Sequence, residues 1–120
     1  MSDYKTIRTD GQAEIIEKKS RFITNIFYVE SEQEAEQKIK EIRKKYFDAK
    51  HHCFAYNIYD ENQMISRFSD DGEPSGTAGS PMLNILNAEN IKNVVVIVTR
   101  YFGGILLGTG GLLRAYTGGL

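Results

Sequence analysis

The sequence has almost none of the residue type from which covalent cross-links are made. Cys53 is the only cysteine among 120 residues. A single thiol excludes an internal disulfide and argues against a structural zinc site of the multi-cysteine kind. The protein is therefore expected to hold itself together by packing, and no metal or cofactor is assigned to it.

Long apolar runs are also missing. The longest aliphatic stretch covers only residues 94–98, and the first ten residues contain no apolar run. A transmembrane helix needs about 20 such residues, and a secretory signal needs an apolar centre after a basic start. Neither export nor membrane insertion is indicated, so the expected location is the cytoplasm, with no membrane partner.

The chain lacks a large excess of one charge. Its net charge is −1, which argues against a strongly electrostatic nucleic-acid binder. The charges are nevertheless segregated, since all 16 acidic residues lie at or before Glu89, whereas the last 31 positions carry only Lys92, Arg100 and Arg114. Ten of the 11 glycines lie from Gly72 onward. The C-terminal part is thus mildly cationic, glycine-rich and apolar, as a surface for anions would be.

Five segments have the composition of β-strands. Residues 13–17 and 21–29 are rich in β-branched and aromatic types and predict a hairpin, as do residues 53–59 and 64–68. The aliphatic run at 93–98 is expected of a strand buried on both faces, at the centre of a sheet.

Three segments are expected to be helical. Ser31 and Glu34 have capping-box spacing, and the helix that they open has an apolar stripe at Ala35, Ile39, Ile42 and Tyr46. Ser80 followed by Pro81 indicates the start of a second helix that runs to about residue 88. A glycine loop at 108–111 leads into the last helix.

With 41% hydrophobic residues, the chain is expected to form one domain with a real core. The predicted order of elements is ββαββαβα. This order indicates an α+β, two-layer sandwich in which helices cover one mostly antiparallel sheet.

The segment at 67–82, RFSDDGEPSGTAGSPM, contains the densest group of acids and turn residues. Asp70, Asp71 and Glu73 are candidates for a divalent-cation or acid–base site, although their spacing does not fit an EF-hand. Alternatively, the Asp-Gly pair forms a turn and an aspartate accepts backbone N–H bonds. A structural role, a ligand or partner surface, and catalysis all remain open.

Two histidines precede the single cysteine. Adjacent residues on a strand point to opposite faces, so His52 cannot act on Cys53 as a catalytic pair. His52 is still a candidate binding residue, because it could reach across the sheet to Asp70 or Arg100.

Two further candidates for anion binding lie near the C-terminus. Gly108, Gly110 and Gly111 before a helix resemble a phosphate-cradling loop, although no Walker A lysine follows. The alternative is that these glycines permit close packing or a positive φ.

Arg100 and Tyr101, just before Gly103 and Gly104, combine a cation, an aromatic ring and free backbone, as RNA-binding sites do. The alternative places Phe102 in the core and pairs Arg100 with the acidic segment.

Three motifs carry a resemblance to a known family: HHCFAY at 51–56, DDGEPSGTAGSPML at 70–83, and VVVIVTRYFGGILLGTGGLLRAY at 94–116. Together they closely resemble the IMPACT family, including its bacterial members. The resemblance implies a fold similar to domain two of ribosomal protein S-five, with a left-handed βαβ crossover. Residues 1–120 are expected to form a single IMPACT-like domain. The ferredoxin-like second domain usual in bacterial relatives is absent from this sequence, which is either a naturally short member or a fragment.

For function, the resemblance implies a translational regulator. Eukaryotic relatives compete for the activator of a starvation-responsive kinase of the initiation factor eIF-two-alpha, and no established catalytic assignment comes with the family. The leading hypothesis is therefore a non-enzymatic binding domain that contacts RNA, the ribosome or a translation-associated protein. Its predicted binding residues are His52, Asp70, Asp71, Glu73, Arg100, Tyr101, Gly103, Gly104, Gly108, Gly110, Gly111 and Arg114.

Two alternatives remain open. One is a hydrolase or phosphotransferase that uses the three acids and the glycine loop. The other is a purely protein–protein interaction module with residues 70–74 as its recognition loop. The sequence does not determine the oligomeric state.

Overall fold

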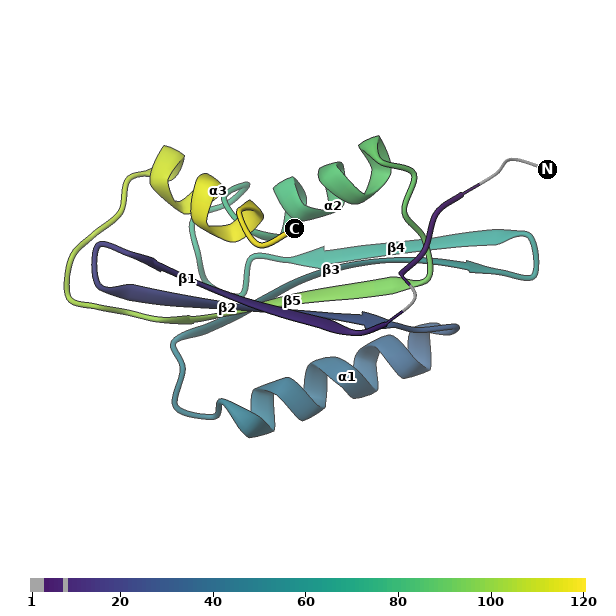
Figure 1. Ribbon diagram of the computed structural model, residues 1–120, viewed down its shortest axis with the longest axis horizontal. Coiled ribbons are helices and arrows are strands. Elements are labelled where there is room, and N and C mark those ends of the chain that lie inside the picture. The colour runs from purple at the N-terminus through teal and green to yellow at the C-terminus, as the bar shows by residue number, and fades with distance from the viewer. Residues whose placement is uncertain (1–3, 8) are drawn as a thin grey trace.

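A five-stranded antiparallel sheet forms the centre of the protein (Figure 1). The computed structural model describes residues 4–7 and 9–120. The strand order across the sheet is β1-β2-β5-β3-β4. The strands are β1 Gly11–Glu17, β2 Ser20–Tyr28, β3 His51–Asp60, β4 Gln63–Ser69 and β5 Val94–Tyr101.

Both predicted hairpins are confirmed, and each turns within two residues. Lys18 and Lys19 join β1 to β2 with φ angles of 47° and 69°, and Glu61 and Asn62 join β3 to β4 with 48° and 65°. Positive φ at both central positions is the geometry that matches the twist of paired strands. These short turns therefore set the register of both hairpins.

The aliphatic run forms the central strand, as predicted. Val94, Val96 and Val98 pack into one apolar cluster, whereas Val95 and Ile97 pack into another on the opposite face. All five side chains are fully buried. Each face of β5 therefore needs its own cover.

Helices supply that cover on both faces (Figure 1). Helix α1 (Glu32–Lys45) lies on one face, and α2 (Gly79–Ala88) and α3 (Thr109–Thr117) lie on the other. The α+β class and the ββαββαβα order are confirmed. The prediction of two layers is wrong, because a sheet that is apolar on both faces must be covered twice. No helix among residues 4–7 and 9–120 is long and apolar enough to span a membrane.

The topology contains a left-handed crossover, as the family resemblance implied. The β2-α1-β3 and β4-α2-β5 units each join two parallel strands and skip one strand between them. Rotating the sheet by 180° in its own plane gives the strands of one unit the same direction as those of the other, and both connections then run the same way across the sheet. Their helices, however, lie on opposite faces. The two crossovers therefore have opposite hands, and one departs from the usual right-handed rule.

Helix α1 begins where the sequence predicts. The Ser31 hydroxyl accepts a hydrogen bond from the Glu34 N–H at 3.1 Å, and the Glu34 carboxylate accepts one from the Glu30 N–H at 3.1 Å. These bonds satisfy two donors near the start of the helix.

Helix α2 begins differently from the prediction. Its N-cap is Ala78 rather than Ser80, and it has no side-chain cap of its own. Instead Asp70 accepts bonds from the N–H groups of Ala78 at 3.2 Å, Gly79 at 2.8 Å and Gly76 at 3.0 Å. The capping side chain comes from eight residues before the N-cap, so local spacing could not reveal it.

The Asp70 cap can be tested by stability measurements. Replacing Asp70 with alanine leaves three N–H groups without their acceptor, and we expect the free energy of unfolding to fall by about 1–2 kcal/mol. Urea unfolding followed by circular dichroism measures this change. The exposed Asp60→Ala is the control, and equal destabilisation by both changes would contradict the capping role.

Candidate functional site

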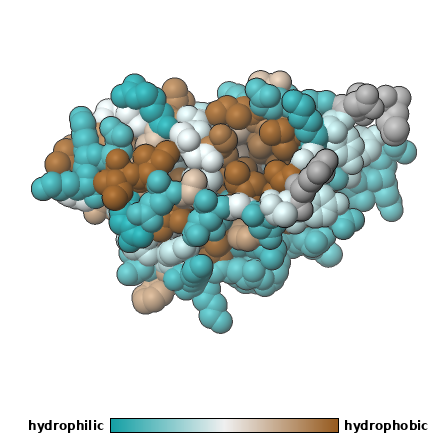
Figure 2. All heavy atoms as spheres, in the orientation of Figure 1, coloured by the Kyte–Doolittle hydropathy of each residue, from teal (hydrophilic) through white to brown (hydrophobic). Residues whose placement is uncertain are grey.

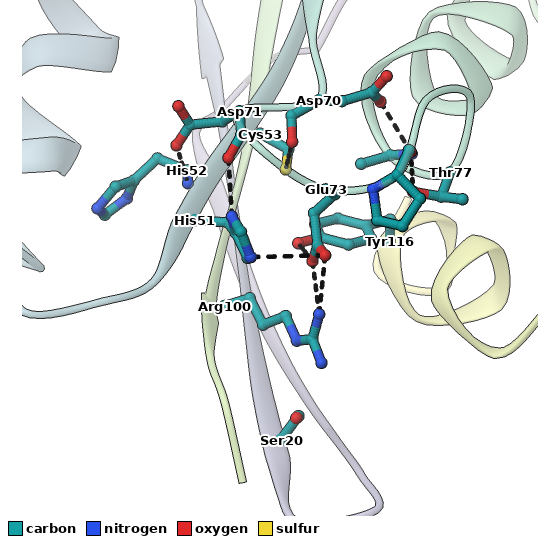
Figure 3. Close-up of polar contacts among 12 residues, drawn as sticks. Ser20, His51, His52, Cys53, Asp70, Asp71, Glu73, Thr77, Arg100 and Tyr116 are labelled. Atoms are coloured by element: carbon teal, nitrogen blue, oxygen red, sulfur yellow. Dashed lines mark hydrogen bonds and ion pairs between the residues drawn. The ribbon is translucent and has the colours of Figure 1, made fainter. Parts of the chain in front are cut away.

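A buried ion pair lies between the acidic segment and the central strand (Figure 3). The side chains of Glu73 and Arg100 are only 3% and 6% exposed. The Arg100 Nη1 donates to both carboxylate oxygens of Glu73, at 2.9 Å and 2.8 Å. The sequence-based alternative that pairs Arg100 with the acidic segment is thus confirmed.

Two more side chains approach the Glu73 carboxylate. The Tyr116 hydroxyl of α3 donates a hydrogen bond to Oε2. The His51 Nε2 lies 3.5 Å from Oε1. The His51 Nδ1 lies 2.7 Å from the carbonyl oxygen of Asp71, and because a carbonyl only accepts, this nitrogen carries the hydrogen. The ring is thereby oriented with Nε2 toward Glu73.

Strand register brings these groups together. Arg100 of β5 is paired with Phe22 of β2 on one side and with His51 of β3 on the other. Directly paired residues share a face of the sheet, so all three side chains point toward α2 and α3. The Arg100 guanidinium carbon lies 5.5 Å from the ring centroids of both Phe22 and Phe102, which hold it in place.

The electrostatics of the cluster keep its neutral donors neutral. Burial raises the pKa of the Tyr116 hydroxyl, so this group remains a hydrogen-bond donor to Glu73. Burial also raises the pKa of the Cys53 thiol, which donates to the Asp70 carbonyl at 3.1 Å. Because only a thiolate is a strong nucleophile, the environment of Cys53 gives it no activation.

The three acids of the segment bind three different parts of the fold. Glu73 pairs with Arg100, and Asp70 caps α2. Asp71 lies 3.3 Å from Arg43 of α1 and accepts the backbone N–H of His52 at 2.7 Å. Figure 3 shows their carboxylates pointing apart. Within the described part of the chain, no group of three His, Cys, Asp or Glu side chains is placed to hold a metal ion.

His52 does not make the predicted contact. Its Nδ1 lies 3.2 Å from the Thr99 hydroxyl, and this side chain occupies the face of the sheet opposite to His51. The expectation that His52 reaches Asp70 or Arg100 is wrong. The preceding residue, His51, is the one that lies beside Arg100 and the acidic segment. The sequence contains both histidines but not the register that decides between them.

The glycines of the predicted loop at 108–111 belong mostly to helix α3 and not to a loop before it. Gly110 and Gly111 lie inside the first turn of α3, and Gly108 is its N-cap with an ordinary φ of −71°. Gly104 has a φ of 87°. A Cβ on Gly103 would lie 2.2 Å from the Lys19 backbone, so this glycine permits the chain to pass close to the β1-β2 turn.

The remaining predicted residues do not gather into one anion site. Tyr101 lies on the opposite face of β5 from Arg100, and its hydroxyl donates to Asp48 at 2.8 Å. Arg114 is exposed on α3. The proposed binding roles of these residues therefore stay predictions.

The connection from β5 to α3 is a feature that sequence reasoning missed. We call residues 102–107 the apolar segment. Its side chains Phe102 and Ile105 are each 42% exposed, Leu106 is 81% exposed, and Leu113 of α3 is 42% exposed. The expectation that Phe102 lies in the core is therefore wrong. Figure 2 shows hydrophobic surface at this end of the molecule, over α3 and the connection from β5. The available signal was a run of three consecutive aliphatic residues, at 105–107, between Gly104 and Gly108.

A hollow of about 290 Å³ lies between the apolar segment and the buried ion pair. Its lining includes Lys50, Glu73, Arg100, Phe102, Leu106 and Leu112. The arrangement places one charged pair at the base of a mainly aliphatic and aromatic wall. Such a hollow can receive a small group from a ligand or partner.

Breaking the buried ion pair tests its contribution to stability. Glu73→Ala leaves the Arg100 charge buried without a partner, and we expect the free energy of unfolding to fall by about 3–5 kcal/mol. Arg100→Met should have a similar effect. The combination of Glu73→Leu with Arg100→Met should cost less than the sum of the single changes, because neither charge is left alone. Strict additivity in urea unfolding would contradict this account.

The burial of His52 predicts a dependence of stability on pH. Burial, followed by the nearby positive charge of Arg43, lowers the pKa of His52 from its ordinary 6.5. The unfolded chain therefore binds the proton first, so the contribution of His52 to stability is complete above pH 6.5 and is lost as pH falls toward its folded-state pKa. Compared with the wild type, His52→Gln should show a shallower loss of stability below pH 6.5 in urea unfolding. An unchanged slope would contradict the prediction.

Comparisons with known proteins agree with the resemblance seen in the sequence. The family model for the "Impact N-terminal domain" matches residues 18–120. The Bacillus subtilis IMPACT family member YvyE is 49% identical over 97% of this chain and 53% of its own length. The Escherichia coli IMPACT family member YigZ is 47% identical over 86% of this chain and 51% of its own length. The chain thus spans about half the length of these curated relatives.

Solved structures match as well. The crystal structure of a hypothetical protein superposes with a TM-score of 0.87 at 41% identity, over 92% of this chain and 54% of that chain. The two-domain translational regulator Yih1 superposes with a TM-score of 0.64 at 24% identity, over 98% of this chain and 50% of its own, which shows a shared fold. On the family model and these sequence relatives, the chain belongs to the IMPACT family.

Proposed function

We propose that this chain is a non-enzymatic binding domain of a translational regulator, and that it contacts a translation-associated protein through the apolar segment and Leu113. The observation that carries the proposal is the exposure of Leu106, which is 81%, beside three further large apolar side chains. Exposing several large apolar side chains to water is unfavourable, and contiguous exposed apolar surface marks sites of protein interaction. The name of Yih1, a translational regulator with this fold, supports the biological setting.

The charges around the segment indicate the chemistry of the partner. The Lys50 ammonium lies 5.2 Å from the centre of the Phe102 ring, and Arg114 is exposed on the same helix as Leu113. No acidic residue occurs from position 90 onward. A complementary partner surface would therefore present apolar side chains flanked by carboxylates, and such complementarity favours rapid and selective association.

A protein partner accounts for these features better than RNA does. The Arg100 guanidinium is buried and paired with Glu73, and Tyr101 is on the other face of its strand. RNA recognition would need exposed cations and stacking rings on one surface. The exposed apolar surface has one ring, that of Phe102, and its other large side chains, Ile105, Leu106 and Leu113, are aliphatic.

Capture from a native lysate, with and without nuclease, tests the proposal. We expect the wild-type domain to retain translation-associated proteins in both cases, and Leu106→Asp to lose them because a charge replaces the central apolar contact. The control is Met64→Asp, an exposed apolar position in the β3-β4 hairpin at the other end of the molecule (Figure 1). Loss of the captured material on nuclease treatment, or capture only of proteins without a role in translation, would contradict the proposal.

A further inference from the structure

The Arg100 side chain is held rigidly but is only partly used. The Phe22 and Phe102 rings lie 5.5 Å from its guanidinium carbon, and Nη1 alone makes both bonds to Glu73. The Nε is buried and has no hydrogen-bond partner, and within the described chain Nη2 has none either. Figure 3 shows the second terminal nitrogen pointing away from Glu73.

This unused edge has a definite chemistry. The Nε–H and one N–H of Nη2 project in parallel from the same side of a guanidinium, and this fork matches the two oxygens of a carboxylate. A buried N–H group without a partner is costly, and an acceptor supplied by a ligand would remove that cost.

The hollow beside Arg100 carries an excess of positive charge. Glu73 neutralises Arg100, but Lys50 is at the rim with its ammonium over the Phe102 ring, and no carboxylate of the described residues pairs with it. A ligand that enters this hollow is therefore expected to be an anion.

The wall of the hollow indicates that the part of the ligand attached to the anion is apolar. Phe102, Leu106, Leu107 and Leu112 line it, and its volume is about 290 Å³. This space is at the small end of the range for ligand pockets and suits a short branched aliphatic or aromatic group.

We propose that the hollow between Lys50, Arg100 and the apolar segment is a binding site for a carboxylate attached to a small apolar group. The carboxylate accepts hydrogen bonds from the unused edge of Arg100 and lies near the Lys50 ammonium, while the apolar group packs against Phe102 and Leu106. The carboxylate belongs either to a free small molecule or to an acidic or terminal residue of a protein. The site stands on its own geometry and does not depend on the proposed protein partner.

A titration followed by nuclear magnetic resonance tests the site directly. The probes are 4-methylpentanoate and its neutral isostere 4-methylpentanamide, added to the ¹⁵N-labelled chain. We expect the carboxylate to shift the Nε–H signal of Arg100, because that group gains a charged acceptor, and the amide to shift it far less, because its single neutral oxygen is a weaker acceptor. An unchanged signal with the carboxylate, or an equal shift with both probes, would overturn the proposal.

Two variants separate binding from folding. Arg100→Lys keeps the charge but removes the fork, so binding of 4-methylpentanoate should be lost. Lys50→Met changes only an exposed side chain and should weaken binding about two- to fivefold, as removal of an exposed charge does. Lys92→Met is the matched control and should have no effect. Unchanged affinity in Lys50→Met, measured through backbone signals of the apolar segment, would overturn the assignment even if Arg100→Lys failed to fold.

A competition experiment identifies the source of the carboxylate. 4-Methylpentanoate is added to the lysate capture described above. Displacement of the captured protein assigns the site to a carboxylate of that partner, and retention assigns it to a free small molecule. Either result identifies the source of the carboxylate once the titration has shown binding. If the titration shows no binding, the site is rejected whether or not the domain captures a protein.

Discussion

The buried pair between Glu73 and Arg100 joins the parts of the chain on which the candidate site depends. Glu73 belongs to the loop after β4, Arg100 to the central strand β5, and Tyr116, which donates to the same carboxylate, to α3. A buried ion pair adds little net stability over an apolar contact of similar size, although the loss of one partner is costly. In this protein the ion pair determines where neighbouring parts of the chain lie. Arg100 lies two residues before the apolar segment, and its contact with the Phe102 ring fixes where that segment leaves the sheet.

The acidic loop is explained largely by the bonds that it makes within the fold. Asp70 holds the start of α2, Asp71 joins α1 and β3, and Glu73 joins β5 and α3. One short loop thereby connects both helical layers to the sheet. Positive φ angles at Asp71, Gly72 and Gly76 provide the tight turns that such a path requires. The acids of the loop are thus engaged within the fold, and their proposed role in binding stays a prediction.

Much of the fold could be predicted because it is encoded by local patterns. The hairpins, the Ser31 cap and the central position of β5 depend on alternation, turn length and apolar runs, which are properties of neighbouring residues. The start of α2 could not be predicted in the same way, since its cap comes from Asp70, outside the helix and its flanking residues. Gly110 and Gly111 belong to the predicted glycine loop, yet α3 includes both of them in its first turn, although glycine is unfavourable in a helix. Packing of Leu112 and Ala115 against the sheet outweighs that local preference.

The candidate site was only partly visible in the sequence. The residue types were present, and the pairing of Arg100 with the acidic segment was one of the open alternatives. The choice of His51 over His52 depends on which residue of β3 lies opposite Arg100, and adjacent residues on a strand face opposite sides. The sequence by itself determined the class of fold, the order of its elements and its family. Only the tertiary structure decided which groups meet, because Glu73, Arg100 and Tyr116 are far apart along the chain and are brought together by strand register and helix packing.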